Sequence, residues 1–210
     1  MSEHHVQEAG ETNGGNAVLE AIRHRRSIGK VKTDPVDRAA IDAMLDAAVW
    51  APNHYHTEPW RFYVMTGEGR RVLGKAYADI AAEEAQTLSE EELAELRARQ
   101  EAKAFRAPVV IAVAVSPSSG PKVLRTEEFA AVHAAVQNML LAAYALGLGA
   151  MWRTGDAAYH PLMREAFGLT GDEQLVGFIF VGYPDMTPHH AKRTPAAAKT
   201  VWLDGSDGTQ

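Results

Sequence analysis

The feature that most restricts how this chain can fold is the segment from Glu127 to Leu146, which contains the run FAAVHAAVQNMLLAAYAL. The run predicts a long helix, and almost every face of that helix carries small or apolar side chains. Roughly 20 helical residues span about 30 Å, and a helix that is apolar nearly all round has to be buried by the fold or by another subunit. Both options stay open, and the second would place this helix at a subunit interface. His133 and Gln137, one turn apart on it, are interpreted as hydrogen-bonding core or interface residues rather than metal ligands, because no carboxylate accompanies them.

The composition excludes several classes of function. The chain has 210 residues, 46% of them hydrophobic, and a formal net charge of −6. This length favours one domain with a substantial core, and the negative charge gives no reason to expect nucleic acid or an anionic membrane as a partner. No cysteine occurs, so disulfides, thiolate metal sites and cysteine nucleophiles are excluded. Any redox chemistry must therefore come from a bound cofactor, and no metal site is expected.

The sequence shows no secretory or membrane-spanning signal. Residues 1–16 are polar and glycine-rich, so we expect a disordered tail followed by a single domain over residues 17–184. The most apolar run, Val109 to Val115, is far shorter than the ~20 residues that a membrane-spanning helix needs. By elimination, the sequence predicts a cytoplasmic protein.

Shorter segments predict a mixture of strands and helices. Trp60 to Met65 and Gln174 to Tyr183 have the aromatic and β-branched residues of strands. Ala107 to Val115 is apolar on both faces, as is typical of a central strand that is covered on two sides. Asp34-Pro35 predicts the start of a helix that runs to about Trp50, because Asp is a good N-cap and Pro fits the first helical position.

The stretch from Glu68 to Arg106 is predicted to be helical but interrupted. Ser89 and Glu92 have the spacing of a capping box that opens a second, mostly charged helix. That helix has only a thin apolar stripe, which favours a position on the surface. It is either a lid or a solvated helical hairpin without a functional role.

A polar loop joins the helix ending near Trp50 to the first strand. In Ala51 to Phe62, APNHYHTEPWRF, Pro52 and Pro59 exclude a helix interior and shape the loop. Between them lie six consecutive hydrogen-bonding side chains, Asn53 to Glu58. A loop held at both ends can aim such groups at a ligand, although a solvated crossover is an equally good interpretation.

Two further segments have the composition of ligand-binding sites. Arg25, Arg26 and Ser27 follow a predicted helix; they suit a phosphate, or they stabilise the helix C-terminus without any ligand. Gly147 to Gly155, GLGAMWRTG, is no dinucleotide-binding fingerprint, because its glycines follow a helix rather than a strand. The glycines do permit the backbone to approach a flat ligand closely.

The end of the chain carries an isolated apolar segment, Lys199 to Leu203, KTVWL, within an otherwise polar extension over residues 185–210. Exposed valine, tryptophan and leucine would be costly in water. We therefore expect this extension to pack on a sheet edge, and specifically on a partner subunit.

Taken together, these segments resemble the nitroreductase family of flavin-dependent oxidoreductases. The family pattern has an Arg-Arg-Ser phosphate motif, an Ala-Pro…Gln-Pro-Trp loop, a long central dimer helix, and Gly-Leu-Gly before Trp-Arg-Ser/Thr-Gly. Order and spacing agree over about residues 17–184, and the Pro-Asn-His form of the loop looks most like the short single-domain branch. The matching segments here are Arg25-Arg26-Ser27, Ala51-Pro52 with Pro59-Trp60, Glu127 to Leu146, Gly147-Leu148-Gly149 and Trp152-Arg153-Thr154-Gly155.

The resemblance implies an α+β fold with a mostly antiparallel central sheet, and an intertwined homodimer with FMN at the subunit interface. It also implies that Arg25, Ser27 and Arg153 hold the phosphate or ribityl chain. His54 would approach the flavin ring, from its own or the partner subunit, as a proton donor or substrate contact. No side chain is an obligatory acid or base. The residues implied in FMN binding are Arg25, Arg26, Ser27, Trp50, Asn53, His54, Glu58, Gly149, Trp152, Arg153 and Thr154.

Three positions depart from the family pattern. Gly29 stands where many members have a basic residue two positions after the serine, so Lys30 or another base must supply positive charge near the flavin, or the reduction potential is shifted. Glu58 replaces the usual glutamine and His56 a frequent asparagine. A carboxylate cannot donate a hydrogen bond, which changes the contacts that this loop can make.

The function implied is reduction of a small organic acceptor, such as a nitroaromatic or a quinone, by NADH or NADPH through FMN in a ping-pong hydride mechanism. One alternative is a flavin-binding storage or sensor protein without significant turnover. Another is an interaction protein without cofactor, in which the arginines and glycines are purely structural.

Overall fold

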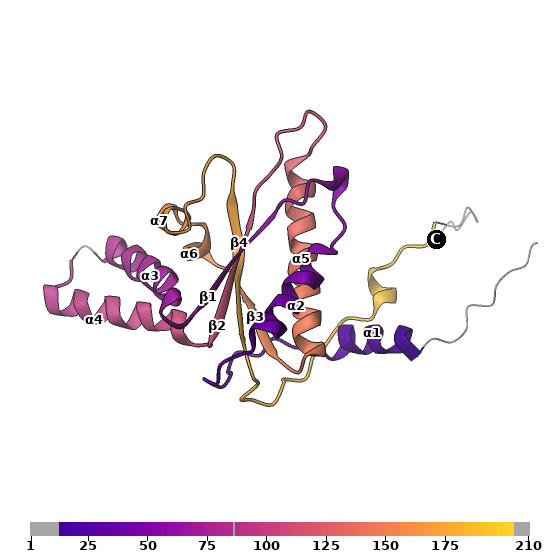
Figure 1. The fold of residues 1–210 in the computed structure, drawn as a ribbon, viewed down its shortest axis with the longest axis horizontal. Helices are drawn as coiled ribbons and strands as arrows, with labels where there is room; N and C mark the ends of the chain where they lie inside the picture. The colour runs from indigo at the N-terminus through magenta and orange to yellow at the C-terminus, as the bar shows by residue number, and fades with distance from the viewer. Residues whose placement is uncertain (1–12, 86, 204–210) are drawn as a thin grey trace, which may run out of the picture.

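A four-stranded antiparallel sheet, with helices on both faces, forms the centre of the protein (Figure 1). The computed structural model describes residues 13–85 and 87–203. In the described chain the strand order is β1-β2-β4-β3, which confirms the predicted α+β class with an antiparallel sheet. The strands are β1 (Trp60–Thr66), β2 (Val109–Val115), β3 (Gly149–Arg153) and β4 (Gln174–Gly182).

The helices form two layers, one on each face of the sheet. Helices α2 and α5 cover one face, and α3, α6 and α7 lie on the other, with α4 packed against α3 away from the sheet (Figure 1). The helices are α1 (Asn13–His24), α2 (Arg38–Val49), α3 (Arg71–Glu84), α4 (Glu90–Glu101), α5 (Arg125–Ala145), α6 (Asp156–Tyr159) and α7 (Pro161–Ala166), and the 3₁₀ turns are η1 (His54–His56), η2 (Gly67–Arg70), η3 (Ala102–Phe105) and η4 (Ala196–Lys199).

Strand β2 is the central strand that its apolar run predicts. All seven residues of VVIAVAV are buried, and the strand pairs with β1 on one side and β4 on the other. Its alternate side chains enter two different cores, because successive residues of a strand point to opposite faces. Ile111 belongs to the core under α5, and Val110 belongs to the core under α3.

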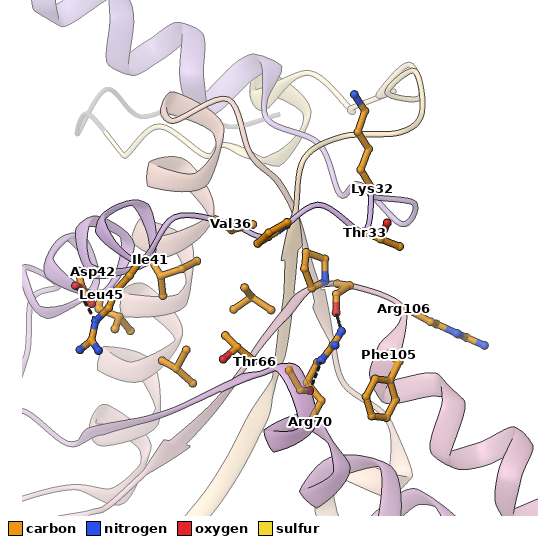
Figure 2. Close-up of a pocket in the computed structure, with 17 residues that line it drawn as sticks. Lys32, Thr33, Val36, Ile41, Asp42, Leu45, Thr66, Arg70, Phe105 and Arg106 are labelled. Atoms are coloured by element: carbon orange, nitrogen blue, oxygen red, sulfur yellow. Dashed lines mark hydrogen bonds and ion pairs between the residues drawn. The ribbon is translucent and has the colours of Figure 1, made fainter.

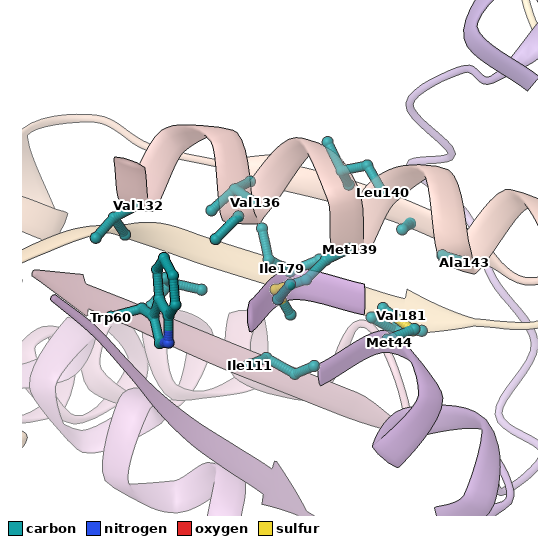
Figure 3. Close-up of a cluster of buried hydrophobic side chains, with 14 of the residues drawn as sticks. Met44, Trp60, Ile111, Val132, Val136, Met139, Leu140, Ala143, Ile179 and Val181 are labelled. Atoms are coloured by element: carbon teal, nitrogen blue, oxygen red, sulfur yellow. The ribbon is translucent and has the colours of Figure 1, made fainter. Parts of the chain in front are cut away.

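The first core lies between the sheet and helices α2 and α5. Figure 3 shows Met44 of α2 and Met139 of α5 among the side chains of Ile111 and Ile179 from the sheet. Met44, Met139 and Ile179 have no exposed surface. This burial accounts for the position of α5, since a fully buried aliphatic side chain stabilises a fold by roughly 1.5–3 kcal/mol.

Helix α5 is buried on one side only. Val132, Val136 and Met139 face the core, whereas His133 and Gln137 are exposed. The chain itself therefore covers half of the helix that the sequence predicts to be apolar nearly all round.

The second core shows that the stretch from Glu68 to Arg106 has two different parts. Helix α3 contributes Leu73 and Ile80 to this core, so it is part of the domain rather than a surface excursion. Helix α4 has no buried residue, as its charged sequence predicts. The predicted capping box is confirmed: the Ser89 hydroxyl accepts from Glu92 N–H, and the Glu92 carboxylate accepts from Ser89 N–H.

Two predicted helix starts differ from the structure. Helix α1 begins at Asn13, within the predicted tail, and the rest of that tail lies outside the described residues. Helix α2 begins at Arg38 rather than after Asp34, because Lys32 N–H donates to Tyr183 O and keeps the preceding chain extended along the sheet. Val36 and Ile41 then pack in the same core, in the positions of a hydrophobic staple across the helix start.

Helix α1 and the C-terminal segment run away from the sheet beyond α5 (Figure 1). Val18, Leu19 and Ile22, the apolar side chains of α1, are each more than half exposed. Trp202 is 84% exposed and Leu203 is 93% exposed. These apolar side chains have no cover from the described part of the chain. No helix there is long and apolar enough to cross a lipid bilayer.

Candidate functional site

The Arg25–Ser27 motif lies directly against strand β3. Ser27 forms a parallel bridge with Ala150, and Ile28 N–H donates to Ala150 O at 3.0 Å. A Cβ at Gly149 would lie 2.8 Å from Ile28 Cγ2. The fold therefore brings the predicted phosphate motif and the predicted glycine segment together, and the glycine permits that close packing.

Arg25 and Arg26 have different surroundings. Arg26 Nη1 donates to the carbonyl oxygens of Arg23 and Arg25 at the end of α1, which fits the interpretation as a helix C-terminal contact. The Nε atom of Arg25 is buried without a hydrogen-bond partner in the described chain. Burial, followed by repulsion from Arg26 and Arg193, lowers the pKa of Arg25. An anion bound beside Arg25 would relieve both effects.

A cavity of about 310 Å³ adjoins these arginines. Its walls include Arg25 and Arg26 on one side and Leu140, Tyr144 and Leu148, from the C-terminal end of α5 and the turn after it, on the other. It lies where a cation cluster meets an apolar wall, which suits an amphiphilic phosphate compound.

A second cavity, of about 400 Å³, lies on the other side of β3. The aromatic side chains of Tyr77 and Phe180 form part of its wall, and Arg153 lies 5.3 Å from the centre of the Phe180 ring. Burial raises the pKa of Tyr77 to about 12, against the opposing effect of Arg153 and Arg106. Arg153 Nε is a second buried guanidinium atom without a partner in the described chain. The lining contains three cations and no carboxylate: Lys103, Arg106 and Arg153.

Trp152 is held in place beside this cavity. Its Nε1 donates to Val176 O at 3.1 Å, and its ring lies 5.6 Å from that of His133. Thr154 follows at the exposed end of β3 and also lines the cavity. Of the predicted site residues, Trp152, Arg153 and Thr154 therefore share one cavity wall.

The loop after α2 has an unusual backbone. Tyr55, His56 and Glu58 all have positive φ, at 57°, 54° and 46°, a region that costs free energy for residues with a side chain. Asn53 stabilises this shape, since its Oδ1 accepts from Glu58 N–H at 3.0 Å and its Nδ2 donates to Ala51 O. The Glu58 side chain is exposed, so the backbone is the part of Glu58 that shapes the loop.

Two acidic residues in the first turn of α5 hold this loop. Glu127 Oε2 lies 2.7 Å from His54 Nδ1. Glu128 Oε1 accepts from the Thr57 hydroxyl at 2.6 Å. Trp50, at the end of α2, is 85% exposed beside the loop. Neither glutamate was predicted as a site residue from the sequence; their place at the helix N-terminus, which favours negative charge, was the only available signal.

The loop and the arginine motif lie at opposite ends of α5. His54 contacts Glu127 near its start, whereas the cavity beside Arg25 is lined by Tyr144 near its end. Seventeen helical residues separate these two positions, which is about 25 Å along the axis. A single chain therefore does not bring His54 and Arg25 to one ligand.

A larger cavity, of about 850 Å³, lies elsewhere (Figure 2). It lies between α2 and the exposed edge of β1, and none of the eleven predicted cofactor contacts lines it. Its wall is apolar and its surroundings are basic. The apolar side chains include Val36, Ile41 and Val64, and the cations include Lys32, Arg70 and Arg106. No group of three or more metal-ligating side chains occurs in the described part of the chain.

Comparison with known proteins identifies the family. The model of the nitroreductase family matches residues 22–183. This chain belongs to the nitroreductase family. It is 36% identical to YfhC of Bacillus subtilis over 181 residues, covering 86% of this chain and 91% of that protein, which is itself only provisionally assigned as an NAD(P)H nitroreductase.

Solved nitroreductase-like structures have the same fold. A nitroreductase-like family protein of Bacillus cereus is 32% identical, with a TM-score of 0.76, and the match covers 90% of this chain and 96% of that one. A protein of Desulfovibrio desulfuricans provisionally assigned as a nitroreductase, solved in complex with FMN, is 29% identical with a TM-score of 0.65, covering 89% and 96% of the two chains. The predicted family, fold and enzyme class, an NAD(P)H-dependent flavin oxidoreductase, are confirmed at the level of the family.

The position of Lys30 bears on whether this residue replaces the basic residue that many nitroreductases have at the position of Gly29. Lys30 Nζ pairs with Asp185 at 2.7 Å, and its side chain is 72% exposed. Gly29 lies beside Met151. The cations that do line the cavity beside Trp152 include Lys103 and Arg106, which sequence reasoning missed because they follow the surface helix α4.

Proposed function

We propose that this nitroreductase-family protein is an FMN-dependent oxidoreductase that uses NADH or NADPH to reduce a small organic acceptor such as a nitroaromatic or a quinone. One observation carries the proposal: the Nε atoms of Arg25 and Arg153 are buried, have no hydrogen-bond partner among the described residues, and adjoin cavities on either side of β3. A buried donor without a partner is costly, and a phosphate ester with a polar ring system supplies acceptors for both. The relatives support the cofactor, since one of them is solved with FMN.

The residues have separate roles in this proposal. Arg25 and Ser27, with Arg193 nearby, would bind the phosphate and ribityl chain, and Arg26 would support them from the end of α1. Thr154, Arg153 and Trp152 would line the ring site with Gly149 behind them. Lys103 and Arg106 would place positive charge where negative charge accumulates on reduction. Bound FMN would supply the hydride chemistry between the nicotinamide and the acceptor.

The remaining predicted contacts belong to the loop that contacts the start of α5 through His54, roughly 25 Å along the helix axis from the end beside the arginine motif. We propose that these residues, Trp50, Asn53, His54 and Glu58, complete the site of a partner in a homodimer. Exposed apolar side chains on α1, at Trp50 and at the C-terminus support such an interface, because large apolar patches mark association surfaces.

We also propose where the C-terminal extension of one subunit binds its partner. The apolar cavity of Figure 2 has the open edge of β1 beside it and a basic rim. The segment Val201 to Leu203 is apolar, and the acidic residues Asp204 and Asp207 follow it in the sequence. An apolar segment followed by negative charge is complementary to an apolar groove with a basic rim.

The proposed function is tested by spectroscopy of the purified protein. We expect a flavin spectrum after incubation with FMN, bleaching on mixing with NADH or NADPH, and reoxidation by a quinone in stopped flow. Arg25→Ala should weaken FMN binding about 10- to 100-fold, the effect of losing a charged hydrogen bond worth roughly 1.5–3 kcal/mol. Arg99→Ala, on the exposed helix α4, is the matched control.

The alternatives give different results. A protein that binds FMN but is not reduced by either nicotinamide would be a storage or sensor protein. A protein that stays colourless with excess FMN would contradict the proposal and favour an interaction protein without cofactor.

A further inference from the structure

His54 and Glu127 form a histidine–carboxylate pair that no predicted role includes. The Nδ1–Oε2 distance is 2.7 Å, and the two residues are 73 positions apart in the sequence. Because an ionised carboxylate only accepts hydrogen bonds, Nδ1 must carry the proton in this contact. The pair therefore fixes the imidazole tautomer and leaves Nε2 as the nitrogen available to a ligand.

The His54 ring is restrained from a second direction. It stacks on the Tyr55 ring, with the centroids 4.0 Å apart and the planes 11° from parallel. Tyr55 itself has a positive φ of 57°, a conformation that persists only when surrounding contacts impose it. A strained residue whose side chain fixes the orientation of a histidine is typical of a preorganised site rather than a solvated crossover.

The neighbouring carboxylate has a different task. Glu128 is 1% exposed, and its two oxygens accept from the Thr57 hydroxyl and from Ser118 N–H. It anchors the loop as a whole. Glu127 is partly exposed and contacts only the His54 side chain among the described hydrogen bonds. The two acids thus separate anchoring of the loop from orientation of the histidine.

We infer that Glu127 is a positioning residue: it holds His54 in the tautomer with the proton on Nδ1, so that Nε2 is presented to the ligand of the adjoining subunit. This inference rests on the proposed function for the identity of that ligand, the flavin or the bound acceptor. The groups that face the imidazole in the described structure are the Glu127 carboxylate from α5 and the Tyr55 ring from its own loop.

Nitrogen NMR of the FMN-loaded full-length protein tests the tautomer directly. The His54 signals are assigned by their loss in His54→Gln. We expect a protonated Nδ1 and an unprotonated Nε2 in the wild type at pH 8, and a rapidly averaged tautomer mixture in Glu127→Ala. Glu127→Gln retains an amide oxygen as acceptor and should keep the wild-type pattern. Identical His54 shifts in the wild type and in Glu127→Ala would overturn the inference.

Turnover supplies the second readout. Glu127→Ala should lower kcat/KM for a quinone about tenfold, and it should have less than a twofold effect in a His54→Ala background, because it acts through His54. The exposed Glu95→Ala on α4 should change neither readout. An equal loss from Glu127→Ala in both backgrounds would show a purely structural role and contradict the inference. A wild type without flavin or turnover would contradict only the proposed function, because the tautomer can be measured without FMN.

Discussion

Lys30 and Lys103 are two of the candidate sources of positive charge beside the flavin. Lys30 is close to the arginine motif in sequence, but its ammonium group pairs with Asp185 at the surface. Lys103 is remote in sequence, yet it lines the same cavity as Arg153 and Thr154. Proximity along the chain therefore favours Lys30 as the source of this charge, whereas the three-dimensional position favours Lys103.

We predict that Lys103→Ala makes the two-electron midpoint potential of the bound FMN more negative. Loss of a cation disfavours the reduced, more negative flavin, and a shift on the order of 30 mV corresponds to about 1.4 kcal/mol for a two-electron couple. Spectroelectrochemistry measures the potential, with Lys30→Ala as the matched control. A larger shift in Lys30→Ala than in Lys103→Ala would contradict the prediction.

Close packing of β3 against β4 depends on a glycine, Gly177. Gly177 in β4 has a φ of 138° and lies opposite the irregular pairing at Val113 and Ala114. A Cβ there would lie 2.4 Å from Trp152 Nε1 and 2.6 Å from Arg153 O. The absence of a side chain in β4 thus lets β3 bring Trp152 and Arg153 to the cavity wall.

Gly177→Ala should therefore destabilise the protein and disturb the ring site together. Overpacking costs typically 1–3 kcal/mol, and the positive φ adds to this. Denaturant titration would show the lower midpoint, and weaker FMN binding should accompany it. Gly69→Ala, where no atom lies within 4 Å of the new Cβ, should stay within about 0.5 kcal/mol of the wild type. Equal stability of the two variants would contradict this explanation.

Loss of the capping box of α4 should destabilise that helix and no other part of the protein. Ser89→Ala removes the hydroxyl that accepts from Glu92 N–H and should cost about 1 kcal/mol of helix stability. Amide hydrogen exchange should show roughly fivefold lower protection in α4 alone.

The capping box also predicts a pH dependence. The backbone hydrogen bond from Ser89 to Glu92, and next the Ser89 hydroxyl, lower the pKa of Glu92. The stabilisation that these hydrogen bonds contribute is fully present above the ordinary carboxyl pKa of 4.5, and it is lost as the pH falls through the lowered pKa of Glu92. The difference in α4 stability between the wild type and Ser89→Ala should therefore become smaller in acid. A difference that stays constant from pH 7 to pH 3 would argue against the capping box.

In the molecule as a whole, two segments that extend beyond the sheet expose several large apolar side chains. Helix α1 presents Val18, Leu19 and Ile22, and the C-terminal segment presents Trp202 and Leu203. Figure 1 shows both segments running away from the body of the domain. Such segments are stable in water when a second chain covers them, which agrees with a site built from two subunits.

We predict that deleting the residues after Ala198 weakens the dimer. Removal of Trp202, an aromatic side chain suited to anchor an interface, should raise the dissociation constant by at least about 30-fold, the effect of 2 kcal/mol. Sedimentation velocity over a concentration series measures this, and Trp202→Ala tests the single side chain. Val64→Lys, in the proposed groove, should have a similar effect on the dimer. Unchanged sedimentation of all three variants would refute this docking of the extension.

The family, the α+β class, the central strand β2 and the capping box could all be predicted from the sequence, because each depends on local pattern. Alternation, helical periodicity, caps and motif order are properties of neighbouring residues. Even so, the predicted start of α2 was wrong, since the backbone hydrogen bond from Lys32 to Tyr183, which follows β4, outweighs the Asp34-Pro35 cap.

Which residues share a site became clear only from the three-dimensional packing. It placed Lys103 and Arg106 beside Arg153, joined Glu127 to His54, and separated His54 from Arg25 by most of the length of α5. These relations join residues tens of positions apart, and no local pattern encodes them. The physical reason is that packing of α5 and β3 in the sheet core, rather than any propensity of the site residues, sets the positions of the polar groups.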